Sequence, residues 1–217
     1  MSTRAVVVVG AGPGVSGSLA RRYAADGWSV GLLGRNGEQV ASLAELLGAS
    51  GVRVETEIVD VTGPEAADAV RRVAERLGRV DVLHFNPSAF RERDPLELSV
   101  PDLLADVALG VGALLTAVQA VRPLLVEGGR ITVTGSMAAD RPWHRAASLG
   151  VQKAGVRNLV HSLDATLRDD GIRAVSVTVN GTLGGDGPFS PDRVAEALVA
   201  AARQDEGDWR TEVPYDG

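Results

Sequence analysis

Residues 5–17 read AVVVVGAGPGVSG. The apolar run 5–9 predicts a buried strand, and the helical pattern that begins near residue 15 predicts that a helix follows at once. Glycines in such a turn let the backbone approach a pyrophosphate, which the N–H groups and positive dipole end of the helix attract. A tight turn without a ligand is the alternative. We expect a dinucleotide phosphate site at Gly10, Gly12, Pro13, Gly14 and Val15.

Short β-branched runs alternate with helix-patterned stretches along the whole chain. The predicted strands cover residues 5–9, 29–33, 53–59, 80–85, 130–134 and 173–179, and the predicted helices cover 15–25, 37–47, 64–77, 101–126 and 147–168. This alternation predicts a parallel sheet with helices on both faces. We expect an α/β fold, a single Rossmann-type doubly wound sheet of about seven strands, with ligands beyond the carboxyl ends of the strands.

The chain after residue 180 adds a loop, a helix and an edge strand to this prediction. The glycine-rich stretch 181–187 is interpreted as a loop, because ordered elements follow it. Ser190 is a typical N-cap with Pro191 behind it, and the helix should end near Arg203. Residues 209–215 predict the edge strand. No stretch divides the chain into halves, so we expect one domain over residues 1–217.

Composition excludes several classes of protein. The net charge is −6 without a basic stripe, which argues against a nucleic-acid partner. The absence of cysteine excludes disulfides and cysteine-bound metals and suits the cytoplasm. The first apolar run is too short for a signal peptide or membrane span, and the apolar region 103–126 holds Asp106, Gln119 and Arg122, which are costly in lipid. We expect a cytoplasmic protein without a membrane partner.

The end of the second predicted strand reads Gly34-Arg35-Asn36. NAD sites usually place Asp or Glu here to bind the adenosine ribose. No carboxylate stands at this place to repel a 2′-phosphate, and the guanidinium of Arg35 offers a planar fork of donors to it. A solvated arginine at a helix start is the alternative. The pattern favours NADP (NADPH) over NAD.

In chain order, these features resemble the short-chain dehydrogenase/reductase family over nearly the whole sequence. The resemblance rests on Gly10, Gly14, Arg35, Asp60-Val61 after strand three, and Asn86 after strand four. It implies that Asp60 and Val61 flank the adenine ring. It also implies that Asn86-Pro87-Ser88, Asn-Ala-Gly in relatives, lines the cofactor. Two motifs depart from the family: its third glycine falls on Ser16, with Gly17 following, and its Pro-Gly after strand six reads Asn180-Gly181.

The resemblance also implies an active centre from which two residues are missing. The family combines a serine after strand five with a tyrosine and a lysine four residues apart, and here Ser136 and Lys153 match while the tyrosine's place is Leu149. The family's asparagine on the preceding helix aligns approximately with Ala108. Lys153 can still hold the nicotinamide ribose. The interpretation is therefore an atypical member without the catalytic tyrosine.

Three side chains remain as candidates for chemistry. Ser136 can donate a hydrogen bond to a carbonyl oxygen, although a capping serine at a strand end is the alternative. His144 lies in a loop over the expected pocket and is the best remaining acid, because imidazole titrates near neutral pH; a solvated histidine is the alternative. Lys153 is the third, against the alternative of a surface lysine. His84 is expected in the core, His161 on a packing or solvent face, Tyr23 and Tyr215 in structural roles, and no metal site is predicted.

The predicted helix 101–126 is apolar almost all around, which is too much for one buried stripe. A subunit partner is the expected cover, and relatives pair this helix and the one with Lys153 across a two-fold axis. We expect a homodimer or homotetramer that acts on a small molecule.

Three functions stay open at this point. The first is an NADP-dependent oxidoreductase for a small carbonyl or alcohol. The second is a non-redox enzyme, such as a cyclase, dehydratase or isomerase, which the apolar Leu149 favours. The third is an inactive NADP-binding protein, since both the tyrosine and the asparagine are absent.

Overall fold

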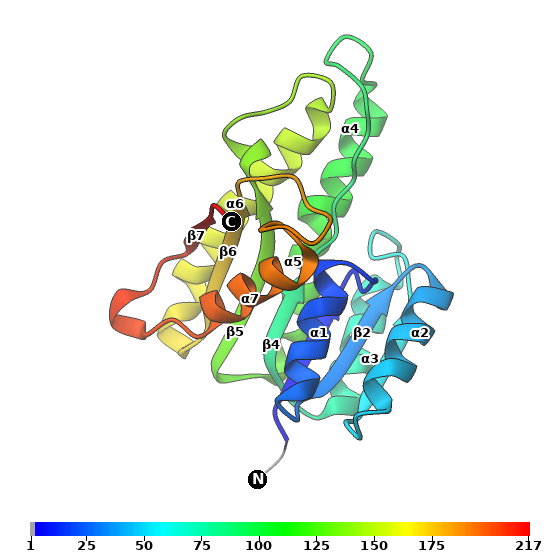
Figure 1. The fold of residues 1–217 in the computed structure, drawn as a ribbon, viewed down its shortest axis with the longest axis vertical. Helices are drawn as coiled ribbons and strands as arrows, with labels where there is room; N and C mark the ends of the chain where they lie inside the picture. The colour runs from blue at the N-terminus through cyan, green and yellow to red at the C-terminus, as the bar shows by residue number, and fades with distance from the viewer. Residues whose placement is uncertain (1–2) are drawn as a thin grey trace.

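The computed structural model describes residues 3–217 and contains one seven-stranded sheet in which all the strand pairs are parallel. The strand order is β3-β2-β1-β4-β5-β6-β7 (Figure 1). The strands are β1 Ala5–Val9, β2 Ser29–Gly34, β3 Val54–Ile58, β4 Val80–Phe85, β5 Leu125–Ser136, β6 Arg173–Val179 and β7 Glu212–Tyr215. The chain order reverses between β1 and β4, which opens a crevice at the carboxyl ends of these strands. The predicted fold class is confirmed.

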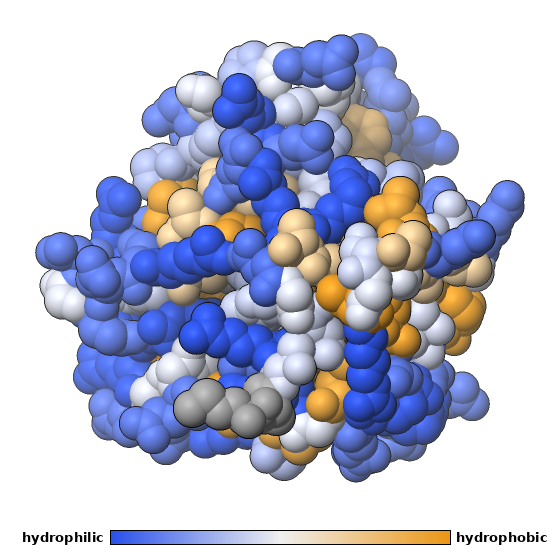
Figure 2. Space-filling view, turned by 60° about the horizontal axis from the view of Figure 1, so that its bottom comes forward, coloured by the Kyte–Doolittle hydropathy of each residue, from blue (hydrophilic) through white to orange (hydrophobic). Residues whose placement is uncertain are grey.

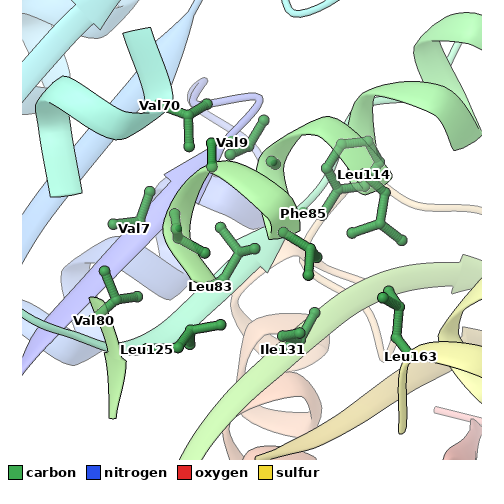
Figure 3. Close-up of a cluster of buried hydrophobic side chains, with 14 of the residues drawn as sticks. Val7, Val9, Val70, Val80, Leu83, Phe85, Leu114, Leu125, Ile131 and Leu163 are labelled. Carbon is green, nitrogen blue, oxygen red and sulfur yellow. The ribbon is translucent and has the colours of Figure 1, made fainter. Parts of the chain in front are cut away.

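Helices cover both faces of the sheet. On one face lie α1 Val15–Ala25, α2 Gly37–Gly48 and α7 Pro191–Ala202, and on the other lie α3 Ala66–Leu77, α5 Ala113–Val121 and α6 Ala147–Leu167. Alternate residues of β1 serve the two faces: Val6 and Val8 pack under α1, whereas Val7 and Val9 pack under α3 and α5. Figure 3 shows the second core, where Leu83 and Phe85 of β4 lie between β1 and Leu114 of α5.

The predicted helix 101–126 is confirmed as an unbroken helical run from Val100 to Leu124, but its hydrogen-bond pattern changes along its length. The chain forms α4 (Val100–Val107), then a π-helical turn Ala108–Gly112, then α5, and a 3-10 turn Arg122–Leu124 ends the run. Pro123 cannot supply the N–H that a continuing helix needs. The strand β5 then begins at Leu125, five residues before the predicted start at Arg130. The prediction missed these five residues because Gly128 and Gly129 interrupt the apolar pattern of a strand.

By length and composition alone, the described helical stretch Val100–Leu124 would suffice to cross a membrane. Most of α5, however, is buried in the core on α3, β4 and β5. Leu104, Leu115 and Val151 remain exposed on α4, α5 and α6, so the subunit contact expected there stays a prediction. The face in Figure 2 is mainly hydrophilic, with small separate apolar patches.

The predicted edge strand forms as β7, which pairs with β6 from Ser176↔Glu212 to Val179↔Tyr215. Trp209, just before it, contacts two guanidinium groups, which lie over its ring at 5.1 Å (Arg130) and 4.7 Å (Arg173) from the centroid. Glu206 pairs with both arginines. These contacts fix the C-terminal segment to the sheet.

Candidate nucleotide-binding and active site

A cavity of about 390 Å³ lies at the carboxyl ends of β1 to β4, where the strand order reverses between β1 and β4. It brings together seven of the residues predicted to bind a cofactor, which come from the ends of four strands: Gly10, Gly12, Arg35, Asn36, Asp60, Val61 and Pro87. Pro13 lines a neighbouring cavity of about 400 Å³, which shares Asn36 and Gln39 with the first. Gly14, Val15, Asn86, Lys153 and Gly181 do not line the first cavity, and Gly181 instead lies against the ring of Phe189.

The turn between β1 and α1 is compact because two glycines make room for backbone. Gly10 has φ +81°, and a Cβ there would lie 2.9 Å from Cδ of Pro87. A Cβ on Gly17 would lie 2.5 Å from the carbonyl oxygen of Gly12. Ser16, where the family has glycine, accepts a hydrogen bond from the Gly12 N–H at 3.1 Å. Close packing of this turn against α1 therefore depends on the absence of a side chain at Gly17.

No side chain caps the N-terminus of α1, and its first turn holds no acidic residue. The first N–H groups of a helix have no partners within the helix. Together with the positive end of the helix dipole, they form a surface that favours an anion. The turn therefore fits a phosphate group, as the sequence predicts.

Arg35 lies exposed at the edge of this cavity and forms no ion pair within residues 3–217. Sixteen of the 21 arginines do pair with a carboxylate. Asp60 accepts hydrogen bonds from the N–H and hydroxyl of Thr62, which lower its pKa, and the charge of Arg35 adds to this effect. The carboxylate of Asp60, which the charge of Arg35 reaches, is thus already hydrogen-bonded to Thr62.

Lys153 lies buried beside the carboxyl ends of β4 and β5. Its side chain is 7% exposed, and its Nζ donates a hydrogen bond to the carbonyl oxygen of Thr134 at 2.9 Å. The hydroxyl of Thr134 donates to Oδ1 of Asn86 at 2.8 Å. Burial lowers the pKa of Lys153 to about 8. The alternative of a surface lysine is therefore wrong.

Leu149 is half-buried on α6, one turn before Lys153 and on the same side of the helix. Ala108, aligned with the family's asparagine, is exposed at the start of the π-helical turn. Neither side chain can donate or accept a proton. Of the four positions that the resemblance assigns to the active centre, Ser136 and Lys153 carry polar side chains.

Ser136 caps the short 3-10 turn Met137–Ala139, because its Oγ accepts a hydrogen bond from the Ala138 N–H at 3.2 Å. The capping role foreseen as the alternative is thus present, but the hydroxyl proton is still available for donation. His144 is exposed in the loop before α6. Beside it, Trp143 stacks on Phe90 with ring centroids 6.1 Å apart.

The other histidines and tyrosines lie where the sequence placed them. His84 is completely buried, its Nδ1 lies 2.9 Å from Oγ1 of Thr132, and burial lowers its pKa to about 3. His161 is exposed on α6, Tyr23 of α1 is buried in the core, and Tyr215 lies on β7. Residues 3–217 hold no group of three His, Asp or Glu side chains arranged to bind a metal ion.

The sequence did not single out three residues at the site. Gln39 and Leu109 line the cavity, and Gln152 is fully buried beside Lys153. The side chain of Gln152 forms two hydrogen bonds with the backbone of Ala89: it accepts one from the Ala89 N–H at 3.0 Å and donates one to the Ala89 carbonyl oxygen at 3.2 Å. It thereby fixes the loop of Pro87 against α6. Only Gln39 carried a signal, since Asn36 and Gln39 have the spacing of a capping box.

Known proteins share both the sequence pattern and the fold. A family model described as short chain dehydrogenase matches residues 4–184. Sulfoacetaldehyde reductase 2 of Chromohalobacter salexigens is 31% identical over 177 residues, which cover 79% of this chain and 70% of that protein. Oxidoreductase UcpA of Escherichia coli K12 is 29% identical, with 82% and 68% covered.

Solved structures agree with these matches. A short chain dehydrogenase from Burkholderia cenocepacia J2315 in complex with NADP superposes with a TM-score of 0.86 at 27% identity, covering 100% of this chain and 97% of that one. A dehydrogenase/reductase from Sinorhizobium meliloti 1021 reaches a TM-score of 0.89 at 24% identity, with 100% and 95% covered, which supports the fold alone.

Proposed function

Because this chain belongs to the short-chain dehydrogenase family, we propose that it is an NADPH-dependent reductase of small carbonyl compounds that works without the family's tyrosine. The observation that carries the proposal is the cavity at the β1/β4 crevice. Arg35, which forms no ion pair in the described chain, lines this cavity together with Gly10 and Gly12 of the turn that leads to the uncapped N-terminus of α1. A phosphorylated adenosine needs both a cation and free N–H groups. The NADP bound to the Burkholderia cenocepacia relative supports the same class of cofactor.

The protein groups near the site divide the work between them. A nicotinamide nucleotide, when bound, would supply the hydride. The hydroxyl of Ser136 donates a hydrogen bond to the substrate's carbonyl oxygen and stabilises the negative charge that develops there. The ammonium of Lys153 holds the ribose hydroxyls. The side chain of Gln152 keeps the loop of Pro87 in place beside them.

Replacing Arg35 with alanine should weaken NADPH binding by about tenfold or more, because a charge-assisted pair with a phosphate contributes roughly 1.5–3 kcal/mol. NADH, which lacks the 2′-phosphate, should bind equally well to both proteins. Fluorescence titration of each nucleotide measures the two affinities. Arg210→Ala is the matched control, because Arg210 is also exposed and without an ion pair. An equal loss for both nucleotides would contradict the preference for NADP.

Hydride transfer itself should be detected as oxidation of NADPH in the presence of small aldehydes and ketones. The panel should include sulfoacetaldehyde, since one relative is named a reductase of this anion. Arg93 and Arg141, on the two loops that flank the start of α6, also lack ion pairs within the described chain and suit an anionic substrate. The measurement is absorbance at the nicotinamide band, with product identified by chromatography.

Two results would redirect the proposal. Product formed without consumption of nucleotide would favour a cyclase, dehydratase or isomerase on the same scaffold. NADPH binding without turnover on any carbonyl would favour an inactive NADP-binding protein.

A further inference from the structure

Lys153 is the only lysine in a sequence that contains 22 basic side chains; the other 21 are arginines. Arginine stays charged at every accessible pH, whereas a buried lysine can release its proton. The one position that holds lysine is also buried, beside the carboxyl ends of β4 and β5. Every other basic side chain in this sequence is an arginine, so Lys153 is the one cation of the chain whose chemistry also allows release of a proton.

We propose that the Nζ of Lys153 is itself the acid that protonates the substrate oxygen. The inference rests on the proposed reductase function and adds a step to it. A hydride from NADPH, which leaves NADP⁺, would go to the carbonyl carbon, and the oxygen gains a proton from the Lys153 ammonium, directly or through a hydroxyl bound to it. The alcohol leaves, and the free amine takes a proton back from water.

The hydrogen bonds of Lys153 leave it free to act in this way. The described contacts use one of its three N–H groups, on the carbonyl oxygen of Thr134, and no carboxylate forms an ion pair with it in residues 3–217. A carboxylate partner would hold the proton in place. Leu149 lies one turn earlier on the same side of α6, and its side chain has no hydroxyl that could carry the proton in place of Lys153.

The other charged groups around Lys153 are bound elsewhere. On α6 and the turn after β5, Arg157 and Asp140 form an ion pair at 2.7 Å, which lowers the pKa of Asp140. Glu212 of β7 contacts Arg157 and Thr178. On α4, burial works against ionisation of Asp106, but hydrogen bonds from Arg91 and Ser148 outweigh it and hold the pKa of Asp106 below its usual value. These two aspartates stay ionised near neutral pH and cannot act as acids.

The single lysine makes a direct test possible. Protein labelled with lysine carrying ¹³C at Cε gives one lysine signal, whose chemical shift reports the protonation of Lys153 with no cofactor present. We expect this signal to titrate near pH 8. The kcat for carbonyl reduction should fall above the same pH, by about tenfold per pH unit.

Variants then show which residue causes the fall of kcat with rising pH. Lys153→Arg should lose it and reduce kcat by about tenfold or more, since arginine does not release its proton. Lys153→Met, checked by circular dichroism, covers the case in which the larger arginine head group disturbs the fold. His144→Gln should keep the inflection. A lysine signal that titrates above pH 10, or a profile that follows His144 instead of Lys153, overturns the inference and leaves the reductase function standing. Absence of any NADPH oxidation overturns both.

Discussion

Gly17→Ala should cost this protein about a hundredfold in NADPH affinity, or roughly 2.7 kcal/mol. A Cβ at this position would lie 2.5 Å from the carbonyl oxygen of Gly12, a backbone atom that cannot rotate away. The turn must therefore open, and the N–H groups at the start of α1 move with it. Because those groups act on a phosphate only at hydrogen-bond distance, a small displacement removes most of their effect. Fluorescence titration with NADPH measures the loss.

Gly48→Ala is the matched control. Gly48 ends α2, and a Cβ there meets nothing within 4 Å. It should leave NADPH affinity unchanged and raise the free energy of unfolding by up to about 1 kcal/mol, as alanine does in helices. Chemical denaturation of both variants separates a disturbed turn from a disturbed fold. If Gly17→Ala bound NADPH within about threefold of the unmodified protein, the turn would not be the phosphate site.

Most strands could be predicted from the sequence, because the sheet is buried on both faces. The segments 5–9, 80–85 and 173–179 are rich in apolar β-branched residues and end at polar residues or glycine, and they match β1, β4 and β6. The first half of β5 was missed, since the Gly128-Gly129 pair interrupts its pattern. The π-helical turn Ala108–Gly112 was missed as well. Such a turn adds one residue and shifts the apolar stripe of a helix, but this helix is apolar on all sides and has no stripe in which the shift could be detected.

The residues of the candidate site also include some that could be predicted from the sequence and some that could not. Gly10, Arg35, Asp60 and Pro87 could be predicted because each follows a strand, and the carboxyl ends of parallel strands meet at one edge of the sheet. Leu109 and Gln152 reach the site through packing of helices against a loop, for which no local sequence pattern exists. The burial of Lys153 also contradicts the ordinary behaviour of lysine on a helix.

The resemblance to the family assigns the place of a tyrosine to Leu149, and this assignment can be considered together with the position of Lys153. In an enzyme with the tyrosine, the ammonium assists a phenol that carries the proton. With Leu149 in its place, Lys153 keeps its contact with Thr134, and burial lowers its pKa to about 8. Proton transfer from a buried amine serves the same step, at a rate that depends on how well the amine reaches the substrate oxygen.

Leu149→Tyr should therefore raise the rate of NADPH oxidation by about a hundredfold or more, the contribution typical of a well-placed general acid. Leu149 is half-buried one turn before Lys153, so a phenol placed there lies on the side of α6 that carries the ammonium. A nearby positive charge lowers the pKa of a phenol and helps it to release a proton. Leu149→Phe, with the same ring but no hydroxyl, should show no gain, and steady-state kinetics with a reactive aldehyde measures the three proteins.

The pH profile of Leu149→Tyr adds a second test, because two coupled acids no longer titrate as one residue. With the phenol present, the inflection in kcat should move away from the pH at which the Lys153 signal titrates. Lys153→Arg should then cost the tyrosine variant less than it costs the natural protein, since arginine can still assist a phenol but cannot replace the acid. A folded, NADPH-binding tyrosine variant that is no faster than Leu149→Phe would show that the pocket around Ser136 no longer positions a carbonyl for reduction. In that case a non-redox reaction would become the better account of this site.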